Sequence, residues 1–169
     1  MAITRYRAAS AAPFAAAAGT APFFVIEGSA TKVVRIKRIS IEGPTLTLVQ
    51  YLDLIVKKNS TAASGGTATA LTKVPIDSGF AAGTANTVNT YTAAPTAGTA
   101  VGVIDAGRML GQATTPAAAG LPQQNTLFDL VAPNTSIVLR GVAEGLSLHF
   151  ANAPASAVTL SVEVEWEEE

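Results

Sequence analysis

The last thirteen residues constrain the fold of this chain more than any other segment. Between residues 157 and 169, apolar side chains occupy every second position: Val158, Leu160, Val162, Val164 and Trp166. Threonine, serine and glutamate lie between them. A period of two is typical of a β-strand with one face on a core and the other in water, whereas a helix would scatter these side chains around its circumference. The pattern predicts an acid-faced, edge-like strand of an antiparallel sheet.

The rest of the chain carries the same kind of signal, and no segment has the pattern of a convincing helix. Strands are predicted at residues 23–26, 32–42, 45–58, 101–110, 127–131, 136–142 and 145–152, and weaker patterns at 71–76 and 88–92 allow two more. About eight strands separated by turn signals indicate an all-β fold, an antiparallel β-sandwich or barrel. Long loops, such as residues 59–72 and 113–122, fit the jelly roll among these architectures.

Two details of the central strands can be tested directly. In residues 32–42 the apolar parity switches at Lys37 and Arg38, which predicts a β-bulge. Gly43 and Pro44 predict a turn, so that residues 45–58 form a separate strand. Since apolar side chains occupy both parities of that strand, we expect it to be central and covered on both faces.

The N-terminal segment has a different composition from the rest. Residues 1–21 are rich in alanine, and Pro13 breaks any helix there into pieces too short to be stable. We predict an extended N-terminal arm over residues 1–21 and a single β-sandwich domain over residues 22–169. An arm of this kind needs something to hold it, and we expect a neighbouring subunit to do so. The candidate partner-binding residues are Arg5, Tyr6, Arg7 and Phe14, and removing the arm should weaken binding while the β-body stays folded.

Charge is nearly balanced overall but unevenly distributed. The net charge of −1 argues against nucleic-acid binding through bulk electrostatics. Residues 1–58 hold eight basic side chains against three acidic ones, whereas residues 129–169 hold seven acidic side chains against Arg140 alone. Opposite patches suit contacts between copies. Cross-strand pairing inside one fold explains the same distribution equally well.

Composition sets further limits on the class of protein. Of the 169 residues, 33 are alanine, so the 49% hydrophobic fraction overstates the core, and we expect contacts with neighbouring subunits to supplement it. There is no cysteine, which excludes disulfides and cysteine metal sites. No apolar run reaches the length of about 18 residues that a membrane-spanning helix needs.

Chemistry-bearing residues are few and scattered. His149 is the one histidine, and its place beside Ser147 on the polar parity of a strand predicts an exposed or surface-paired side chain. The four aspartates, Asp53, Asp77, Asp105 and Asp129, lie far apart in the sequence. If Asp53 or Asp105 is buried it needs a partner, such as Arg108 or a lysine. No nucleophile elbow or phosphate-binding loop is present, and the acidic tail is expected to be solvated. We therefore predict no catalytic, cofactor or metal site, and no enzymatic activity.

Several stretches resemble a known group of proteins. These are VKKNSTAASGGTATALTKVPIDSG (residues 56–79), NTYTAAPTAGTAVG (89–102), IVLRG (137–141) and LSVEVEW (160–166). The pattern is similar to that of small structural virion proteins of tailed bacteriophages. The resemblance implies a jelly roll or similar sandwich, a place on the capsid surface as a decoration (cement) protein, and no catalytic residues.

The function expected on this basis is adhesion. The partners would be the major capsid protein and further copies of the chain, with a trimer as the expected oligomer, and no nucleic acid, membrane or small-molecule substrate. The alternative is a head-fibre or tail-associated module that recognises a host receptor or carbohydrate. Glycan sites use exposed aromatic rings, and this chain has one tryptophan, three tyrosines and six phenylalanines, with Trp166 on the buried parity of its strand.

Overall fold

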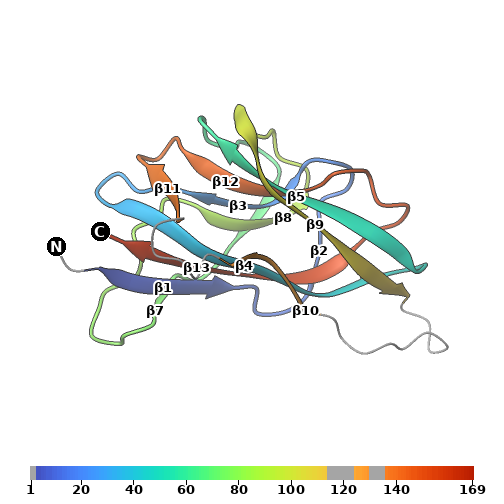
Figure 1. The fold of residues 1–169 in the computed structure, drawn as a ribbon, viewed down its shortest axis with the longest axis horizontal. Coiled ribbons are helices and arrows are strands. Elements are labelled where there is room, and N and C mark those ends of the chain that lie inside the picture. Colours follow the sequence, from blue (N-terminus) through green and yellow to red (C-terminus); the bar gives the residue numbers. More distant parts are fainter. Residues whose placement is uncertain (1–2, 114–123, 130–135) are drawn as a thin grey trace.

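The computed structural model describes residues 3–113, 124–129 and 136–169, and for residues 124–129 it describes the backbone alone. The described residues form strands, turns and loops and contain no helix, which confirms the all-β prediction (Figure 1). The strands are β1 (Thr4–Ala9), β2 (Phe14–Ala15), β3 (Pro22–Glu27), β4 (Val33–Leu46), β5 (Gln50–Asn59), β6 (Thr67–Ala70), β7 (Val74–Pro75), β8 (Val88–Ala93), β9 (Ala100–Ala113), β10 (Gln124–Asp129), β11 (Ile137–Arg140), β12 (Gly145–Phe150) and β13 (Thr159–Glu168).

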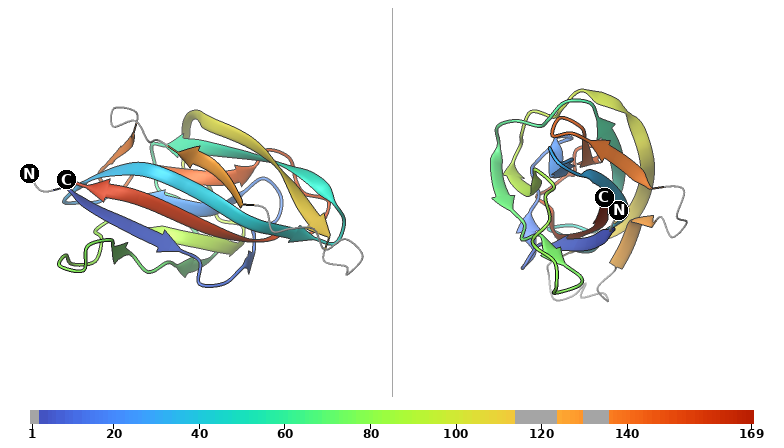
Figure 2. Two further views of the ribbon diagram at one scale, coloured as in Figure 1. Left: turned by 60° about the horizontal axis from the view of Figure 1, so that its bottom comes forward. Right: turned by 90° about the vertical axis from the view of Figure 1, so that its left-hand side faces the viewer.

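These strands form one curled sheet. Along its main path the order is β6-β8-β3-β12-β5-β9-β4-β13-β1-β7, while β10 and β11 pair with β4 and β2 pairs with β13. Among the described pairings, only that of β4 with β9 is parallel, and it joins Thr45 and Leu46 to Gln112 and Ala113. Seen end-on, the strands curve around a common interior (Figure 2).

A single apolar core fills that interior. Its largest fully buried side chains are Trp166, Phe23, Phe24, Phe150, Ile26, Ile36, Ile39, Ile41, Leu46, Leu52, Leu54 and Leu139. Phe23 and Phe150 stack with ring centroids 4.7 Å apart. Burying one such side chain stabilises the fold by about 1.5–3 kcal/mol, so this cluster is the main source of stability.

The C-terminal strand alternates as predicted but is not an edge. Leu160, Val162, Val164 and Trp166 are all buried in β13. On one side β13 pairs with β4 and on the other with β1. The prediction of an edge strand was wrong because an acidic face does not by itself mark an edge: here basic side chains on both neighbouring strands cover the glutamates.

The N-terminal segment belongs to the body of this chain. All six residues of β1 pair with β13, from Thr4 opposite Glu168 to Ala9 opposite Glu163. Ala8, Ala16 and Ala17 are buried, because their small side chains let the segment approach the core closely. A neighbouring subunit is therefore not needed to hold it, and removing residues 1–21 would take away the strands β1 and β2 rather than a free arm.

The hairpin of β4 and β5 differs from the prediction. β4 continues through Gly43, which has a φ of +55°, as far as Leu46, and the chain turns at residues 47–49. The turn predicted at Gly43 and Pro44 was wrong. Leu48 and Tyr51 are 70% and 69% exposed. Farther along β5 the face of Leu52, Leu54 and Val56 is buried and the other face is only half-buried, so the strand is central but is not buried on both faces as expected.

The predicted bulge is confirmed. Ile36 lies opposite Trp166 and Arg38 lies opposite Glu165, which leaves Lys37 as the extra residue on β4. The described residues form thirteen strands rather than about eight, because short pairings such as β2, β6 and β7 add to the long strands. The predicted loop at 113–122, all but its first residue, lies outside the described residues.

Candidate partner-binding surface

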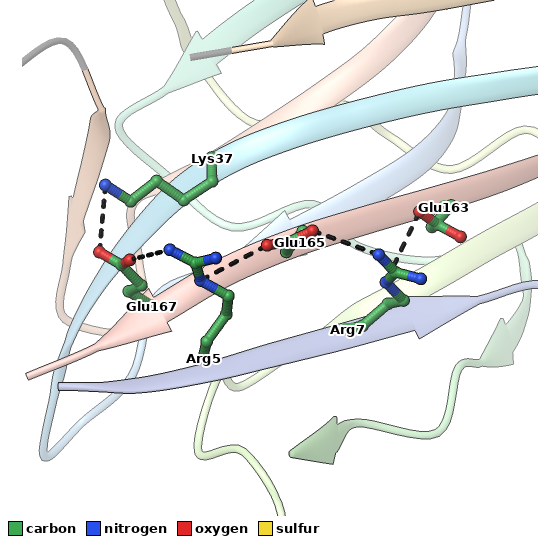
Figure 3. A network of polar contacts seen from close by, with 6 residues as sticks. All are labelled: Arg5, Arg7, Lys37, Glu163, Glu165 and Glu167. Atoms are coloured by element: carbon green, nitrogen blue, oxygen red, sulfur yellow. Dashed lines mark hydrogen bonds and ion pairs between the residues drawn. The ribbon is translucent and has the colours of Figure 1, made fainter. Parts of the chain in front are cut away.

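A ladder of ion pairs covers the outer face of β1, β13 and the start of β4. It consists of Arg5, Arg7, Lys37, Glu163, Glu165 and Glu167 (Figure 3). The alternation of β13 and of β1 places these side chains on one face, since every second residue of each strand points inward.

The pairs differ in length along the ladder. Arg5 Nη2 lies 3.0 Å from Glu167 Oε1, and Lys37 Nζ lies 3.1 Å from the other oxygen of the same carboxylate. Arg7 is held more loosely, at 3.4 Å from Glu165 and 3.7 Å from Glu163. Of the two explanations for the uneven charge, cross-strand pairing inside one fold therefore accounts for these residues.

The pKa values of two glutamates near the end of β13, Glu167 and Glu169, are lowered. Partial burial raises the pKa of Glu167, but the hydrogen bonds from Arg5 and Lys37 outweigh it, so the pKa of Glu167 lies below its usual value. A hydrogen bond from Arg35, 2.9 Å long, lowers the pKa of Glu169. Both carboxylates are ionised at neutral pH and remain engaged with basic partners.

The predicted partner-binding residues separate into two groups. The side chains of Arg5 and Arg7 are about half exposed, at 53% and 47%, and face outward from β1. Tyr6 is buried and stacks on Trp166 with ring centroids 5.7 Å apart. Phe14 is partly buried against the same core. The two aromatic side chains therefore stabilise this chain itself, and the two arginines are the ones a partner can reach.

An apolar pocket that sequence reasoning missed lies beside Arg7. Its volume is about 570 Å³, and it is lined by Arg7, Ala9, Ala11, Thr72, Val74, Pro75 and Ile76. Val74 and Ile76 are more than half exposed, at 52% and 54%. The pocket arises because the short strand β7 pairs with β1 at Tyr6 and Arg7, a contact between residues far apart in the chain. The sequence signal was one valine and one isoleucine, Val74 and Ile76, on either side of Pro75. This pattern is too short to predict which strand the segment pairs with.

His149 is buried, which corrects the prediction of an exposed side chain. The parity was correct, but the segment before β3 covers this face of β12: His149 Nδ1 donates to the Thr20 carbonyl at 3.0 Å. With that tautomer, Nε2 accepts from the Ser147 hydroxyl at 2.8 Å, and Ser147 Oγ accepts from Asn59 Nδ2 at 2.8 Å. Burial lowers the pKa of His149 more than the hydrogen bond to Thr20 raises it. Because Ser147 is fully buried, the network ties segments together and offers no route to a substrate.

Asp53, Asp77 and Asp105 each have different hydrogen-bond partners. Arg108 donates to Asp53 through Nε and, at 3.2 Å, through Nη2, so the predicted partner is confirmed. This bidentate hydrogen bond lowers the pKa of Asp53. Asp77 and Asp105 accept from the backbone N–H groups of Gly79 and Ala106. The side chain of Asp129 lies outside the described residues.

Two buried glutamates organise the loops, and no pattern in the sequence indicated them. Glu168 is 3% exposed and accepts hydrogen bonds from Trp166 and from residues 84 and 85. Glu27 is 3% exposed and accepts from the backbone of Ala63 and the side chain of Asn86. The prediction of a solvated acidic tail is wrong for Glu168, because the loop before β8 folds over it.

Two other kinds of site are absent from the part of the chain that the structure describes. Within the described ranges, no group of three or more histidine, cysteine, aspartate or glutamate side chains is placed to hold a metal ion. The same residues include no helix of the length and apolarity needed to span a bilayer.

No protein-family model matches this chain, and no curated protein or solved structure matches it.

Proposed function

We propose that this chain is a structural virion protein of a tailed bacteriophage, which decorates and stabilises the capsid by binding the major capsid protein lattice as a homo-oligomer. We also propose that its fold is a jelly roll. The pairing order of the strands is the observation that carries both proposals.

The order supports a jelly roll when the short additional strands are set aside. β10 and β11 lie end to end along the same edge of β4 and count as one strand. Numbering β1, β3, β4, β5, β9, β10 with β11, β12 and β13 from one to eight gives two neighbour orders, 1-8-3-6 and 2-7-4-5. This is the strand order of an eight-stranded jelly roll, an architecture that recurs in viral capsid domains.

The surface also supports adhesion. The pocket beside Arg7 offers an apolar hollow next to a charged ladder, and apolar centres with charged rims are the usual anatomy of protein interfaces. Among the basic residues of the ladder, Arg7 has the longest ion pairs. Replacing its glutamate partners by a group on a bound protein therefore costs the least free energy.

The test is binding of the purified protein to purified phage head shells that lack it, measured by co-sedimentation. We expect the wild type to sediment with the shells and Val74→Asp to lose binding, because Val74 lies opposite Arg7, and a carboxylate there makes the apolar pocket polar and pairs with the arginine that a partner would reach. Val142→Asp, at a site 43% exposed and outside the pocket, is the control and should bind normally. Absence of wild-type binding to head shells would overturn the proposal.

A second candidate is recognition of a receptor or carbohydrate by a head-fibre or tail module. One observation favours it: the ring of Tyr51 is 69% exposed, with the Arg108 guanidinium 5.7 Å from its centroid and Asp53 beside it. An exposed aromatic ring next to hydrogen-bonding groups suits a sugar. Binding of glycans by the wild type that is lost in Tyr51→Ala would favour this candidate.

A further inference from the structure

The first five residues of β9, 100–104, are apolar and exposed on both faces of the strand. All five residues from 100 to 104 are exposed, with Val101 at 67%, Val103 at 57% and Ile104 at 39%. One edge of this segment pairs with β5. On the other edge, backbone pairing to the described part of the chain begins only at Gln112.

This edge lacks the usual protection against pairing with another strand. Natural edge strands carry charged residues or proline, which discourage such pairing. Residues 96–104 contain neither. Two bulges are present, since Val101 and Ile104 are extra residues relative to β5. Bulges increase the local twist, which favours one short pairing over open-ended growth of a sheet.

We propose that residues 100–104 of β9 pair antiparallel with the same residues of a second copy, across a two-fold axis. Strands that are apolar on both faces normally lie inside a sheet, and pairing would give β9 that position. Each copy would supply backbone donors and acceptors to an edge that has no pairing with the described residues before Gln112.

A second copy fits this edge better than an unlike partner for two reasons. A two-fold contact places the same neutral segment on both sides, so no like charges meet along the pairing. The whole chain has a net charge of only −1, so long-range repulsion between copies is weak. The contact predicts a dimer or another even-numbered assembly in place of the trimer expected from the sequence. It does not depend on the proposed virion function, because its test uses the purified protein alone.

The first experiment is the mass in solution by sedimentation equilibrium at micromolar concentration. One chain has a mass of 17.1 kDa, so the dimer is expected at twice this, 34.2 kDa. Val103→Lys should weaken association by about 100-fold or more, because an ammonium group at the apolar contact loses hydration without gaining a partner. Val49→Lys is the matched control: Val49 is 54% exposed, lies in the turn before β5 at the end far from residues 100–104, and its replacement should leave the dimer intact.

The second experiment tests the pairing itself and does not rely on disrupting it. The chain has no cysteine, so a single introduced thiol can be followed alone. A side chain at Gly102 meets no atom within 4 Å, and Gly102→Cys should form a disulfide-linked dimer under mild oxidation, whereas Val49→Cys should not. A monomeric wild type, a mass of three chains, or equal cross-linking of the two cysteine variants would overturn the proposal.

Discussion

Replacing Glu168 by alanine should destabilise the protein more than any other single glutamate change on β13. The carboxylate is 3% exposed and holds the loop before β8 against the end of the strand. Its Oε1 accepts from Trp166 Nε1 at 2.9 Å and from the N–H of Ala85 at 3.0 Å. Its Oε2 accepts from the N–H and the hydroxyl of Thr84, at 2.9 and 2.7 Å.

The expected loss follows from the donors left behind. In Glu168→Ala three N–H groups, those of Trp166, Ala85 and Thr84, lose their acceptor. A buried donor without a partner costs about 1–3 kcal/mol. Thr84 is exposed and can turn to water, so it contributes little. The buried donors of Trp166 and Ala85 remain, so we expect a loss of about 2–6 kcal/mol for the two together. Glu168→Gln keeps one acceptor oxygen and should lose about 1–3 kcal/mol.

The assay is urea unfolding followed by the fluorescence of Trp166, the one tryptophan of the chain. The matched control is Glu163→Ala on the same strand, whose side chain is 24% exposed and whose ion pair to Arg7 spans 3.7 Å. Such exposed pairs contribute about 0–1 kcal/mol. If Glu168→Ala cost no more free energy of unfolding than Glu163→Ala, the account of this loop would be refuted.

Three further predictions concern the core, a close approach and pH. Tyr6→Ala should lower the free energy of unfolding by about 3–5 kcal/mol in urea, because it removes the stack on Trp166; a loss under about 1 kcal/mol would mean that β1 is not part of the core. Gly28→Ala should lower the melting temperature, because a Cβ there would meet the Gly141 carbonyl oxygen; an unchanged melting temperature would contradict this contact. Burial lowers the pKa of His149, so the unfolded chain binds a proton more readily than the folded one. Stability should therefore be full above about pH 6.5 and fall as the pH drops below it, and His149→Gln should flatten this dependence in unfolding curves.

The period-two pattern of apolar residues predicted much of the fold. It placed β13 and its buried Trp166 correctly, and the parity switch in β4 located the bulge at Lys37. These signals are local, since they depend on side chains that share one strand. They do not reveal which strands are neighbours, so the acidic face of β13 predicts an edge strand although β1 and β4 flank it on both sides.

The errors arose where distant segments meet. Alanine-rich residues 1–21 looked too weakly apolar to be held, yet small side chains such as Ala8 and Ala17 are what allow close packing. His149 has the expected parity but lies under Thr20. The pocket depends on β7 meeting β1, a pairing of only two residues on each strand. Gly43 and Pro44 predict a turn because glycine and proline usually end strands, whereas the pairing with β13 continues β4 through this position.

The claim that this chain is a capsid decoration protein is tested most directly by locating it in a purified phage particle with electron cryomicroscopy. We predict density of this fold on the outer surface of the head shell, in contact with the major capsid protein and present in many copies. Density confined to a head fibre or the tail tip, or a particle that lacks the protein altogether, would contradict it.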